Sequence, residues 1–427
     1  MSSLIDRLRD VVRHAGSTEQ DPPCVLPEHA GQPSTDVAEI LGGAWHESIG
    51  HRYLVIDRKY LPGHRHGALA VADVHPPDDG VWPRLVLLES SLSPQGRMMF
   101  LDLETTGLAG GAGTYAFLVG CAWFDGAVFR VRQFFLSSFG AERALLHGLL
   151  ELMTTAHAVV TYNGKTFDIP LIDTRYAMHR MPTPFDNLPH LDMLHSARRL
   201  WRTNHGNDFG RQSSCRLGAL EQLLCGHVRD GDVPGCEIPS RYFHYVRTAD
   251  PRPLEAVFEH NRLDLLSLAW LTARAARLLD EGPAGATSAR EALGLGRLYE
   301  RAAMFAEARE CYRRAADFGG EDGVSHAQAL RGYAVLLRRE RLYEEAAAAW
   351  RRLLELPECP ASLVREATEA LAVHHEHRAR DLHAARLFAL RALQFESTVP
   401  RLNAVHHRLA RLTRKLGDPS VGSAELF

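Results

Sequence analysis

The chain has 427 residues, of which 45% are hydrophobic and 24% are charged, and its formal net charge is −3. This length accommodates two or three domains with a sizeable core, and the composition is that of an ordinary globular protein. The small negative charge excludes nucleic-acid binding through a global basic field, although a local basic groove is sufficient for such binding.

Targeting signals and cysteines indicate the compartment. No segment approaches the roughly 18 consecutive apolar residues that a membrane span needs, and the N-terminal residues contain no signal-peptide core. The seven cysteines form neither a C-x-x-C pair nor a zinc-binding spacing. An odd number of cysteines without a framework is typical of reduced thiols. We therefore expect a cytoplasmic protein that does not enter a membrane.

The first part of the chain contains few regular elements. Residues 1–45 are predicted to form a flexible leader and linker, because one amphipathic helix is followed by a stretch rich in Pro, Gly, Ser and Thr. The apolar runs at 53–57 and 84–90 predict strands that pack with their loops onto the next domain. His64 and His66 lie between these runs, where a loop role is favoured over a metal site.

Residues 46–280 are predicted to form a mixed α/β domain. Residues 98–104, 114–124 and 128–136 predict three consecutive strands, the last two joined by a turn at Asp125-Gly126. The pattern then predicts a helix at 142–153, a buried strand at 157–163, and helices at 167–180, 196–202, 215–225 and 254–279. This order indicates a mixed sheet with helices on its faces.

Residues 288–418 are rich in Ala, Arg, Leu and Glu and contain a repeat with an offset of 38 residues. In this alignment Ala308, Tyr312 and Ala315 match Ala346, Trp350 and Leu353. The spacing resembles that of tetratricopeptide helix pairs, whose period is about 34 residues. Such pairs stack into a solenoid whose concave face binds partners, so an all-α repeat domain that docks a protein partner is predicted. A generic helical bundle is the alternative.

Two acids end the first strand of the α/β domain. Residues two apart point to the same side of a strand, so Asp102 and Glu104 should share one face with Leu101 and Leu103 packed behind them. Carboxylates this close repel each other unless they share a cation or one is protonated. An isolated D-x-E is usually a strand end with solvated acids, so the interpretation depends on whether further acids join them.

Two further acids occur in suitable elements. Asp168 follows a buried strand at the start of a helix, and Asp264 lies beside the predicted buried stripe of the long helix. His260 precedes Asp264 by one helical turn on the same face. A buried aspartate is costly unless it is paired, and a metal ion is a common partner. Each acid alone is more simply a cap or a surface charge, but the set favours one site.

Four carboxylates can bind two Mg²⁺ or Mn²⁺ ions about 3.5–4 Å apart, an arrangement that cleaves phosphodiesters. One ion makes the attacking water more acidic and the other stabilises the leaving oxygen. A general base must take the proton of the water, and His260 is the nearest candidate. We therefore predict metal-dependent hydrolysis of a nucleic-acid backbone, with Asp102, Glu104, Asp168 and Asp264 as ligands.

Other residues are weaker candidates. Asn163 and Lys165 lie beside Asp168 and could contact phosphate, although Asn163 could also shape a turn. Asp192 could end another strand near the site, where a structural role is favoured. An arginine-rich segment around Trp201 could bind phosphates and stack on a base, or form an ordinary solvated helix face; its arginines are Arg198, Arg199, Arg202, Arg211 and Arg216.

The four acids resemble those of the DEDD exonuclease superfamily, whose members have a ribonuclease H-like fold. Residues 101–108, LDLETTGL, resemble its first motif, residues 162–170, YNGKTFDIP, its second, and HNRLD at 260–264 its third. The glycine-rich residues 110–114 and the block 215–242 are similar to the YprB-type branch. The resemblance covers about residues 50–280. It implies that backbone just after the first motif holds the terminal nucleotide, at Thr105, Gly107 and Leu108.

The position of the base departs from the two main subclasses of this superfamily. They place a histidine five residues before the last aspartate or a tyrosine four before it, whereas here Glu259 and His260 hold these positions. The function predicted is a 3′–5′ exonuclease acting on DNA or RNA. The alternatives are a catalytically weak nucleic-acid-binding scaffold, or a structure-selective endonuclease.

Overall fold

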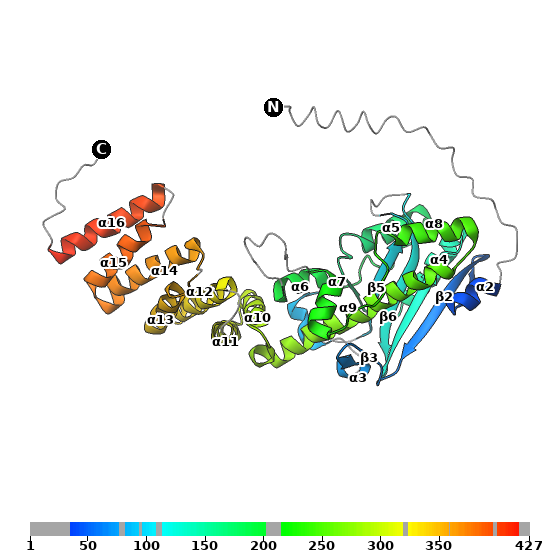
Figure 1. Cartoon of the computed structure of the whole chain (residues 1–427), viewed down its shortest axis with the longest axis horizontal. Helices are drawn as coiled ribbons and strands as arrows, with labels where there is room; N and C mark the ends of the chain where they lie inside the picture. Colours follow the sequence, from blue (N-terminus) through cyan, green and yellow to red (C-terminus); the bar gives the residue numbers. More distant parts are fainter. Residues whose placement is uncertain are drawn as a thin grey trace, which may run out of the picture.

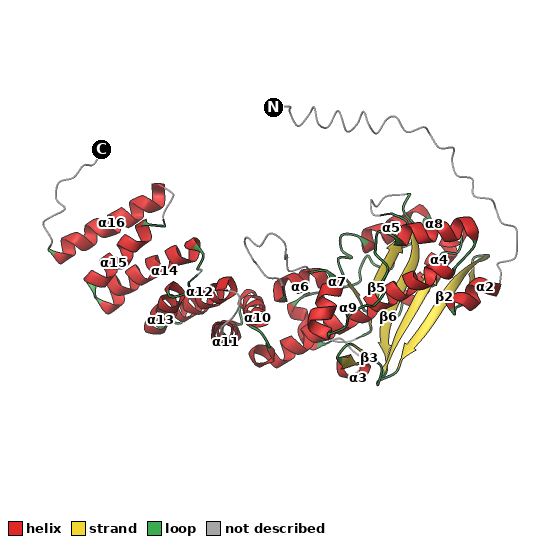
Figure 2. Cartoon of the chain, viewed as in Figure 1, coloured by secondary structure: helices red, strands yellow, loops and turns green. Residues whose placement is uncertain are grey.

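The computed structural model describes residues 35–76, 82–93, 96–107, 113–201, 215–318, 323–357, 359–395 and 399–417 (Figure 1). A sheet with helices on its faces is followed by a row of helices that extends away from it (Figure 2). The mixed α/β domain and the all-helical C-terminal region predicted from the sequence are therefore both confirmed.

One sheet of seven strands organises the first half, in the order β1-β2-β7-β6-β5-β8-β9. Its strands are β1 Ala44–Ser48, β2 His51–Tyr60, β5 Met98–Thr105, β6 Ala116–Asp125, β7 Val128–Phe135, β8 Ala158–Thr161 and β9 His190–Asp192. The pairs from β1 to β5 are antiparallel, whereas β5-β8 and β8-β9 are parallel. β3 Arg65–His66 and β4 Leu69–Ala70 form a separate small hairpin.

Strand β5 contributes to both layers of the core because its side chains alternate between the two faces. Leu101 and Leu103 pack in one hydrophobic cluster, with α4 Glu142–Met153, α5 Asp168–Met178 and α8 Ile238–Thr248. Phe100 packs in the other cluster, together with α6 Met193–Leu200 and α9 Glu255–Glu281. Asp102 and Glu104 lie two and four residues after Phe100, so their side chains point to the same face of the sheet as Phe100, the face covered by α9.

The elements before β5 differ in part from the prediction. α2 Thr35–Leu41 falls within the predicted leader and β1 begins at its end, and Val37 and Leu41 are buried in the core. The run 53–57 lies in β2 as predicted. The run 84–90 was predicted as a strand, but Pro83–Leu87 form a 3₁₀ helix that begins with proline. Leu85 in this helix and Leu88 just after it lie three residues apart and are both buried, and this packing overrides the local strand pattern. α3 Val71–Val74 completes this part.

The later elements agree closely with the sequence. The helices predicted at 142–153, 167–180, 196–202 and 254–279 are present as α4, α5, α6 and α9. The helix predicted at 215–225 is divided into α7 Leu217–Leu220 and a π-helical turn, Glu221–Cys225. Short 3₁₀ turns are formed by Phe139–Ala141, Arg252–Leu254 and Gly282–Gly285. α8 was not predicted.

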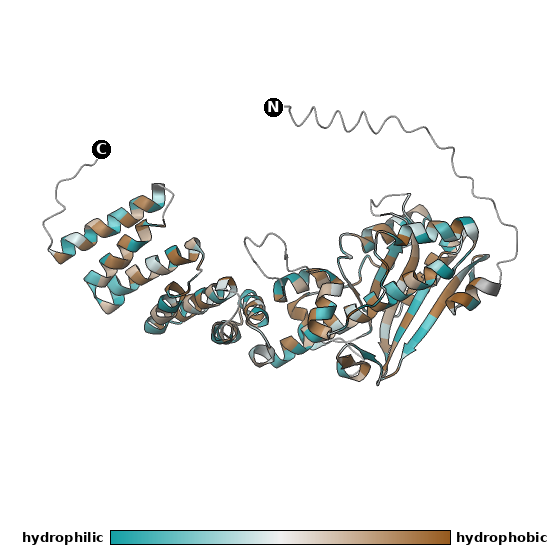
Figure 3. Cartoon of the chain, viewed as in Figure 1, coloured by the Kyte–Doolittle hydropathy of each residue, from teal (hydrophilic) through white to brown (hydrophobic). Residues whose placement is uncertain are grey.

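The C-terminal region consists of helices that contact their neighbours in sequence. They are α10 Ala289–Arg301, α11 Phe305–Asp317, α12 Gly323–Arg339, α13 Tyr343–Leu354, α14 Ala361–His374, α15 Leu382–Leu393 and α16 Val399–Leu416, with a π turn at His375–Ala379. α11 and α13 occupy equivalent places in the 38-residue repeat. Apolar and polar residues alternate along these helices (Figure 3). Their assignment as tetratricopeptide repeats stays a prediction.

Two further findings concern the hydrophobicity of the helices and the state of the cysteines. Within the described residues, no helix combines the length and hydrophobicity needed to cross a bilayer. The cysteines at 121, 215, 225, 236, 311 and 359 are free thiols.

Candidate active site

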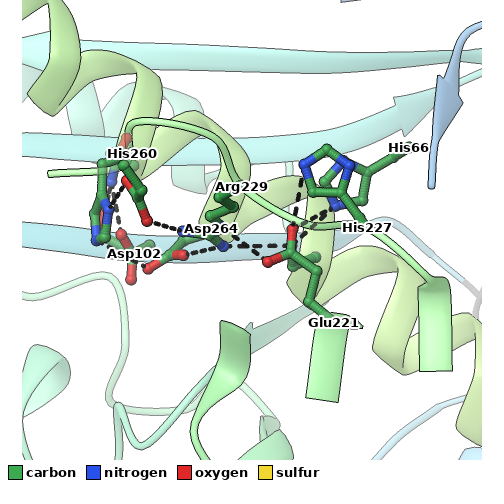
Figure 4. A network of polar contacts seen from close by, with 10 residues as sticks. His66, Asp102, Glu221, His227, Arg229, His260 and Asp264 are labelled. Carbon is green, nitrogen blue, oxygen red and sulfur yellow. Dashed lines mark hydrogen bonds and ion pairs between the residues drawn. The ribbon is translucent and has the colours of Figure 1, made fainter. Parts of the chain in front are cut away.

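The four predicted acids converge where β5, α5 and α9 meet. Asp102 projects from β5 towards α9, where Asn261 donates to its carboxylate, and Asp264 lies on that helix (Figure 4). Glu104 lies two residues further along β5 on the same face, and the charges of Asp264 and Asp168 act on it. Asp168 is the first residue of α5, and its carboxylate accepts backbone hydrogen bonds from its own N–H and from that of Leu103 in β5. Residues separated by more than 150 positions in sequence are therefore brought to one end of the sheet.

Burial and mutual repulsion together raise the pKa values of three of these acids. Burial and the charges of Asp264, Glu104 and Asp168 raise the pKa of Asp102 well above its usual range. Burial and the charges of Asp264 and Asp168 do the same to the pKa of Glu104. The pKa of Asp168 is raised to about 7, mainly by burial and by the charge of Asp192. The carboxylates thus lack sufficient positive charge to balance them.

Amide side chains fix the orientation of Asp102. The Asn261 Nδ2 donates to Asp102 Oδ2 at 2.8 Å and to the Asp102 carbonyl at 3.2 Å. Gln133 in turn donates to Asn261 Oδ1 at 2.8 Å and to the Phe258 carbonyl at 2.9 Å. Gly120 lies opposite Asp102 on β6, and a Cβ there would come within 2.3 Å of Asn261 Oδ1. A glycine is therefore needed for α9 to approach the sheet at this point.

Asp264 is held by an arginine that the sequence analysis did not single out. The Arg229 guanidinium donates to Asp264 Oδ1 at 2.6 Å, to Glu221 Oε2 at 2.7 Å and to Asp232 Oδ2 at 3.2 Å. The other oxygen, Asp264 Oδ2, lies 3.7 Å from His260 Nε2. Arg229 partly offsets the negative charge of the site and leaves one oxygen of Asp264 available to a cation.

His260 reaches the acidic group from its position four residues before Asp264. Its Nδ1 lies 2.7 Å from Asp232 Oδ1, and its Nε2 is directed at Asp264 (Figure 4). A carboxylate bonded to one ring nitrogen fixes the orientation of the imidazole and leaves the other nitrogen for chemistry. The one-residue shift from the usual position of the histidine therefore still brings the ring to Asp264, one of the four acids.

A second group of polar residues anchors Arg229 from behind. His66 Nε2 and the Ser267 hydroxyl lie 2.8 Å and 2.6 Å from Glu221 Oε1, and the His227 ring stacks on that of His66 with centroids 4.2 Å apart. The ligand atoms of His66, Glu221 and His227 lie within 4.8 Å of one another. Both Glu221 oxygens already have partners, so this group serves first to hold Arg229. His66, predicted as a loop residue, is buried on β3.

Asp192 shapes the loop after β8. It caps α6 by accepting from Leu194 N–H, and it also accepts from the backbone N–H groups of Asn163 at 2.8 Å and Lys165 at 3.1 Å. Asn163 adopts a left-handed conformation, with φ of 68°. The Lys165 ammonium donates to Glu89 Oε2 at 2.9 Å rather than to an acid of the site. The structural role favoured for Asp192 agrees with these contacts.

The structure describes some of the remaining predicted residues and not others. The Thr105 hydroxyl donates to the Gly107 carbonyl at 2.9 Å, next to an irregularity in the β5-β6 pairing between Glu104 and Thr105. Leu108 lies outside the described residues, as do Arg202 and Arg211. Trp201 is buried, and its indole donates to Glu291 Oε1, so it is not available to stack on a base.

The donor set fits divalent cations. Carboxylate oxygens are the preferred ligands of Mg²⁺ and Mn²⁺. Four carboxylates lie close together here, and a bound cation would remove the repulsion between their negative charges. Asp102, Glu104, Asp168 and Asp264 are therefore the residues that would hold such ions.

The sequence of this chain is similar to those of known proteins. The family model described as the RNase H superfamily matches residues 99–276. The chain is 30% identical over 372 residues to YprB, an uncharacterized protein of Bacillus subtilis (strain 168), and the alignment covers 85% of this chain and 86% of YprB. The family B DNA polymerase from the archaeon Pyrobaculum calidifontis is similar in structure with a TM-score of 0.32 and 13% identity, over 49% of this chain and 30% of the polymerase chain. Residues 99–276 are thus an RNase H superfamily domain, and the chain belongs to the same family as YprB.

Proposed function

We propose that this protein is a divalent-metal-dependent nuclease of the DEDD type, a 3′–5′ exonuclease that hydrolyses phosphodiester bonds of DNA or RNA. The observation that supports this most directly is the convergence of Asp102, Glu104, Asp168 and Asp264 at one end of an RNase H-like sheet. Burial, together with repulsion between carboxylates, raises the pKa of three of these acids. A protein that needed only stability would not retain such a group.

Each residue has a role that follows from its contacts. Two Mg²⁺ or Mn²⁺ ions would neutralise the phosphate and make the attacking water more acidic. His260, oriented by Asp232, would take the proton of an attacking water as the water oxygen bonds to phosphorus. The P–O bond to the 3′ oxygen of the next nucleotide would break, and that oxygen would take a proton from solvent. Arg229 and Asn261 position Asp264 and Asp102.

Substrate contacts are proposed for the backbone beyond β5 and for the loop after β8. Thr105, Gly107 and Leu108 would hold the terminal nucleotide. Asn163 and Lys165 would contact phosphate. For this contact Lys165 would have to leave its exposed ion pair with Glu89 and bind the substrate instead. Such exposed pairs are worth at most about 1 kcal/mol. The C-terminal helices are proposed to be tetratricopeptide-like repeats that dock a protein partner, and the protein is proposed to be cytoplasmic.

The test uses end-labelled single strands of DNA and RNA with Mn²⁺ or Mg²⁺, each in linear and circular form. The proposal predicts stepwise shortening of the linear strands, intact circles, and no cleavage by Asp102→Asn. Cleavage of circles would show an endonuclease instead. Binding without cleavage by the folded wild-type protein, under every metal condition, would favour the scaffold alternative.

A further inference from the structure

A positively charged cavity lies where the sheet domain meets the helical region. It is lined by side chains of α6, α10 and α12, among them Arg199, Arg290, Arg297 and Gln328. The pocket is small and partly open, and the space among these side chains measures about 250 Å³ only when the adjoining open solvent is included. The described residues around this cavity include no aspartate or glutamate. Three guanidinium groups therefore face one space without a carboxylate to neutralise them.

The positive charge of this cavity is poorly balanced by its surroundings. Arg290 Nε is buried and has no hydrogen-bond partner in the described part of the chain. Burial and the charges of Arg199 and Arg297 lower the pKa of the nearby Arg301. The acid next to Arg290 in sequence, Glu291, is already shared by Trp201, Arg274 and Thr287. Arg199 and Arg297 each donate to a neutral acceptor, the Leu88 carbonyl and Gln328 Oε1, which leaves their charges in place. A cluster of positive charges of this kind attracts an anion.

The cavity is held rigidly. A Cβ on Gly294 of α10 would lie 2.6 Å from the Leu200 carbonyl, so α6 and α10 pack backbone to backbone. The buried Glu291 carboxylate joins the same two helices through Trp201 and ties them to α9 through Arg274. The arginines on α6 and α10 therefore keep their spacing without a ligand, which limits the entropy lost on binding.

Helix α6 connects this cavity to the candidate active site. Its first turn is capped by Asp192, whose charge acts on Asp168 and whose oxygens hold the loop after β8. Arg199 lies seven residues further along the same helix, which at 1.5 Å per residue is about 10 Å along the axis. Helix α6, labelled in Figure 1, therefore runs from the loop that precedes Asp168 to the arginine cavity.

We propose that this cavity binds a backbone phosphate of a single-stranded nucleic acid whose end occupies the acidic site. The assignment of the anion to nucleic acid rests on the function proposed above. Arginine suits this role because its planar guanidinium makes paired hydrogen bonds to phosphate oxygens. The junction between the two regions then extends the substrate-binding surface, in addition to any partner docked by the repeats.

The experiment measures binding by the full-length chain in an Asp102→Asn background, which prevents cleavage. Fluorescence anisotropy is recorded with single strands of about 20 and about 4 nucleotides, over a range of salt concentrations. The test variant is Arg290→Gln/Arg297→Gln. The matched control is Arg338→Gln/Arg401→Gln, which removes the same charge from exposed positions on α12 and α16.

One phosphate contact on a single strand contributes a slope of about 0.7 in log K against log salt, or about fivefold in affinity at about 0.1 M salt. The test variant should therefore bind the long strand at least about fivefold more weakly, with a shallower slope, and the short strand nearly unchanged. The control should match the parent. If the test variant unfolds, Arg199→Gln, an exposed position on α6, should give the same loss.

Equal affinity and slope for test and control variants would overturn the proposal. A second result would also overturn it: the test variant loses the binding of inorganic phosphate, measured by calorimetry, but binds the long strand as tightly as the parent does. The cavity would then bind a free anion and not the nucleic acid. These outcomes are independent of cleavage. A wild-type protein that cuts nothing would refute the proposed nuclease and leave this binding test valid.

Discussion

Replacing Asp168 with asparagine should stabilise the metal-free protein. The pKa of Asp168 rises from its ordinary 3.8 to about 7 in the folded chain. A carboxyl with a raised pKa in the folded state lowers stability as the pH climbs from the unfolded value to the folded one, and the loss is constant above that. Each tenfold change in proton affinity is worth about 1.4 kcal/mol, so the full cost above pH 7 is at most about 4 kcal/mol.

The measurable gain is smaller because Asp168 is only half-buried and solvent screens its charge. We expect about 2 kcal/mol at about pH 8, and less than about 1 kcal/mol at about pH 5, where the folded carboxyl keeps its proton. For a chain of 427 residues, whose unfolding entropy is about 2 cal/mol/K per residue, the larger gain corresponds to a rise of roughly 2 °C in the unfolding midpoint. Asparagine keeps an oxygen that can accept the Leu103 N–H, so the fold should be retained.

Thermal unfolding in EDTA at the two pH values measures this effect, with Asp230→Asn as an exposed control. Addition of Mn²⁺ should reverse the order of the two proteins, since ligand binding raises the midpoint of the wild type and not of the variant. No gain for Asp168→Asn at the higher pH, or a gain independent of pH, would refute the electrostatic argument.

The remaining predictions concern the same site. Mn²⁺ affinity should fall as the pH drops below about 7, because three of the acids bind protons more tightly than usual. Calorimetry in two buffers should detect the release of protons when Mn²⁺ binds. Absence of this release would contradict the raised pKa values of the acids. His260→Ala should lower kcat by about 10²–10⁴-fold, whereas the exposed His244→Ala should not; an unchanged kcat would remove His260 as the base. Gly120→Ala should cost about 1–3 kcal/mol, because its Cβ would overlap Asn261. Gly140→Ala, with open space around its Cβ, is the control in urea unfolding, and equal losses would show that the close packing is not limiting.

Local patterns predicted the elements that carry the acids. The period of two along β5 placed Asp102 and Glu104 on one face, and the period of the long helix put His260 beside Asp264. Glycine and arginine positions were less informative. Gly120 is required by a helix that follows it by 140 residues, and no local signal marks that contact.

Arg229 could not be found from sequence because its partners are scattered. It bonds to Glu221, Asp232 and Asp264, which come from a π turn, a loop and a helix. The charged residues within the block 215–242 were the one available hint. At Trp201 the sequence pattern suggested a role that the structure does not support. An aromatic residue among arginines suggested base stacking, but Trp201 is buried and donates to Glu291, so it joins the sheet domain to the helical region.

The most direct test of the central proposal is the rate of Mn²⁺-dependent hydrolysis of an end-labelled single strand by wild type and Asp102→Asn. The proposal predicts cleavage by the wild type that stops in EDTA and falls by at least about 10³-fold in the variant, because the carboxylate acts on the reacting phosphate through a bound ion. Comparable rates for the two proteins, or cleavage that persists in EDTA, would contradict it.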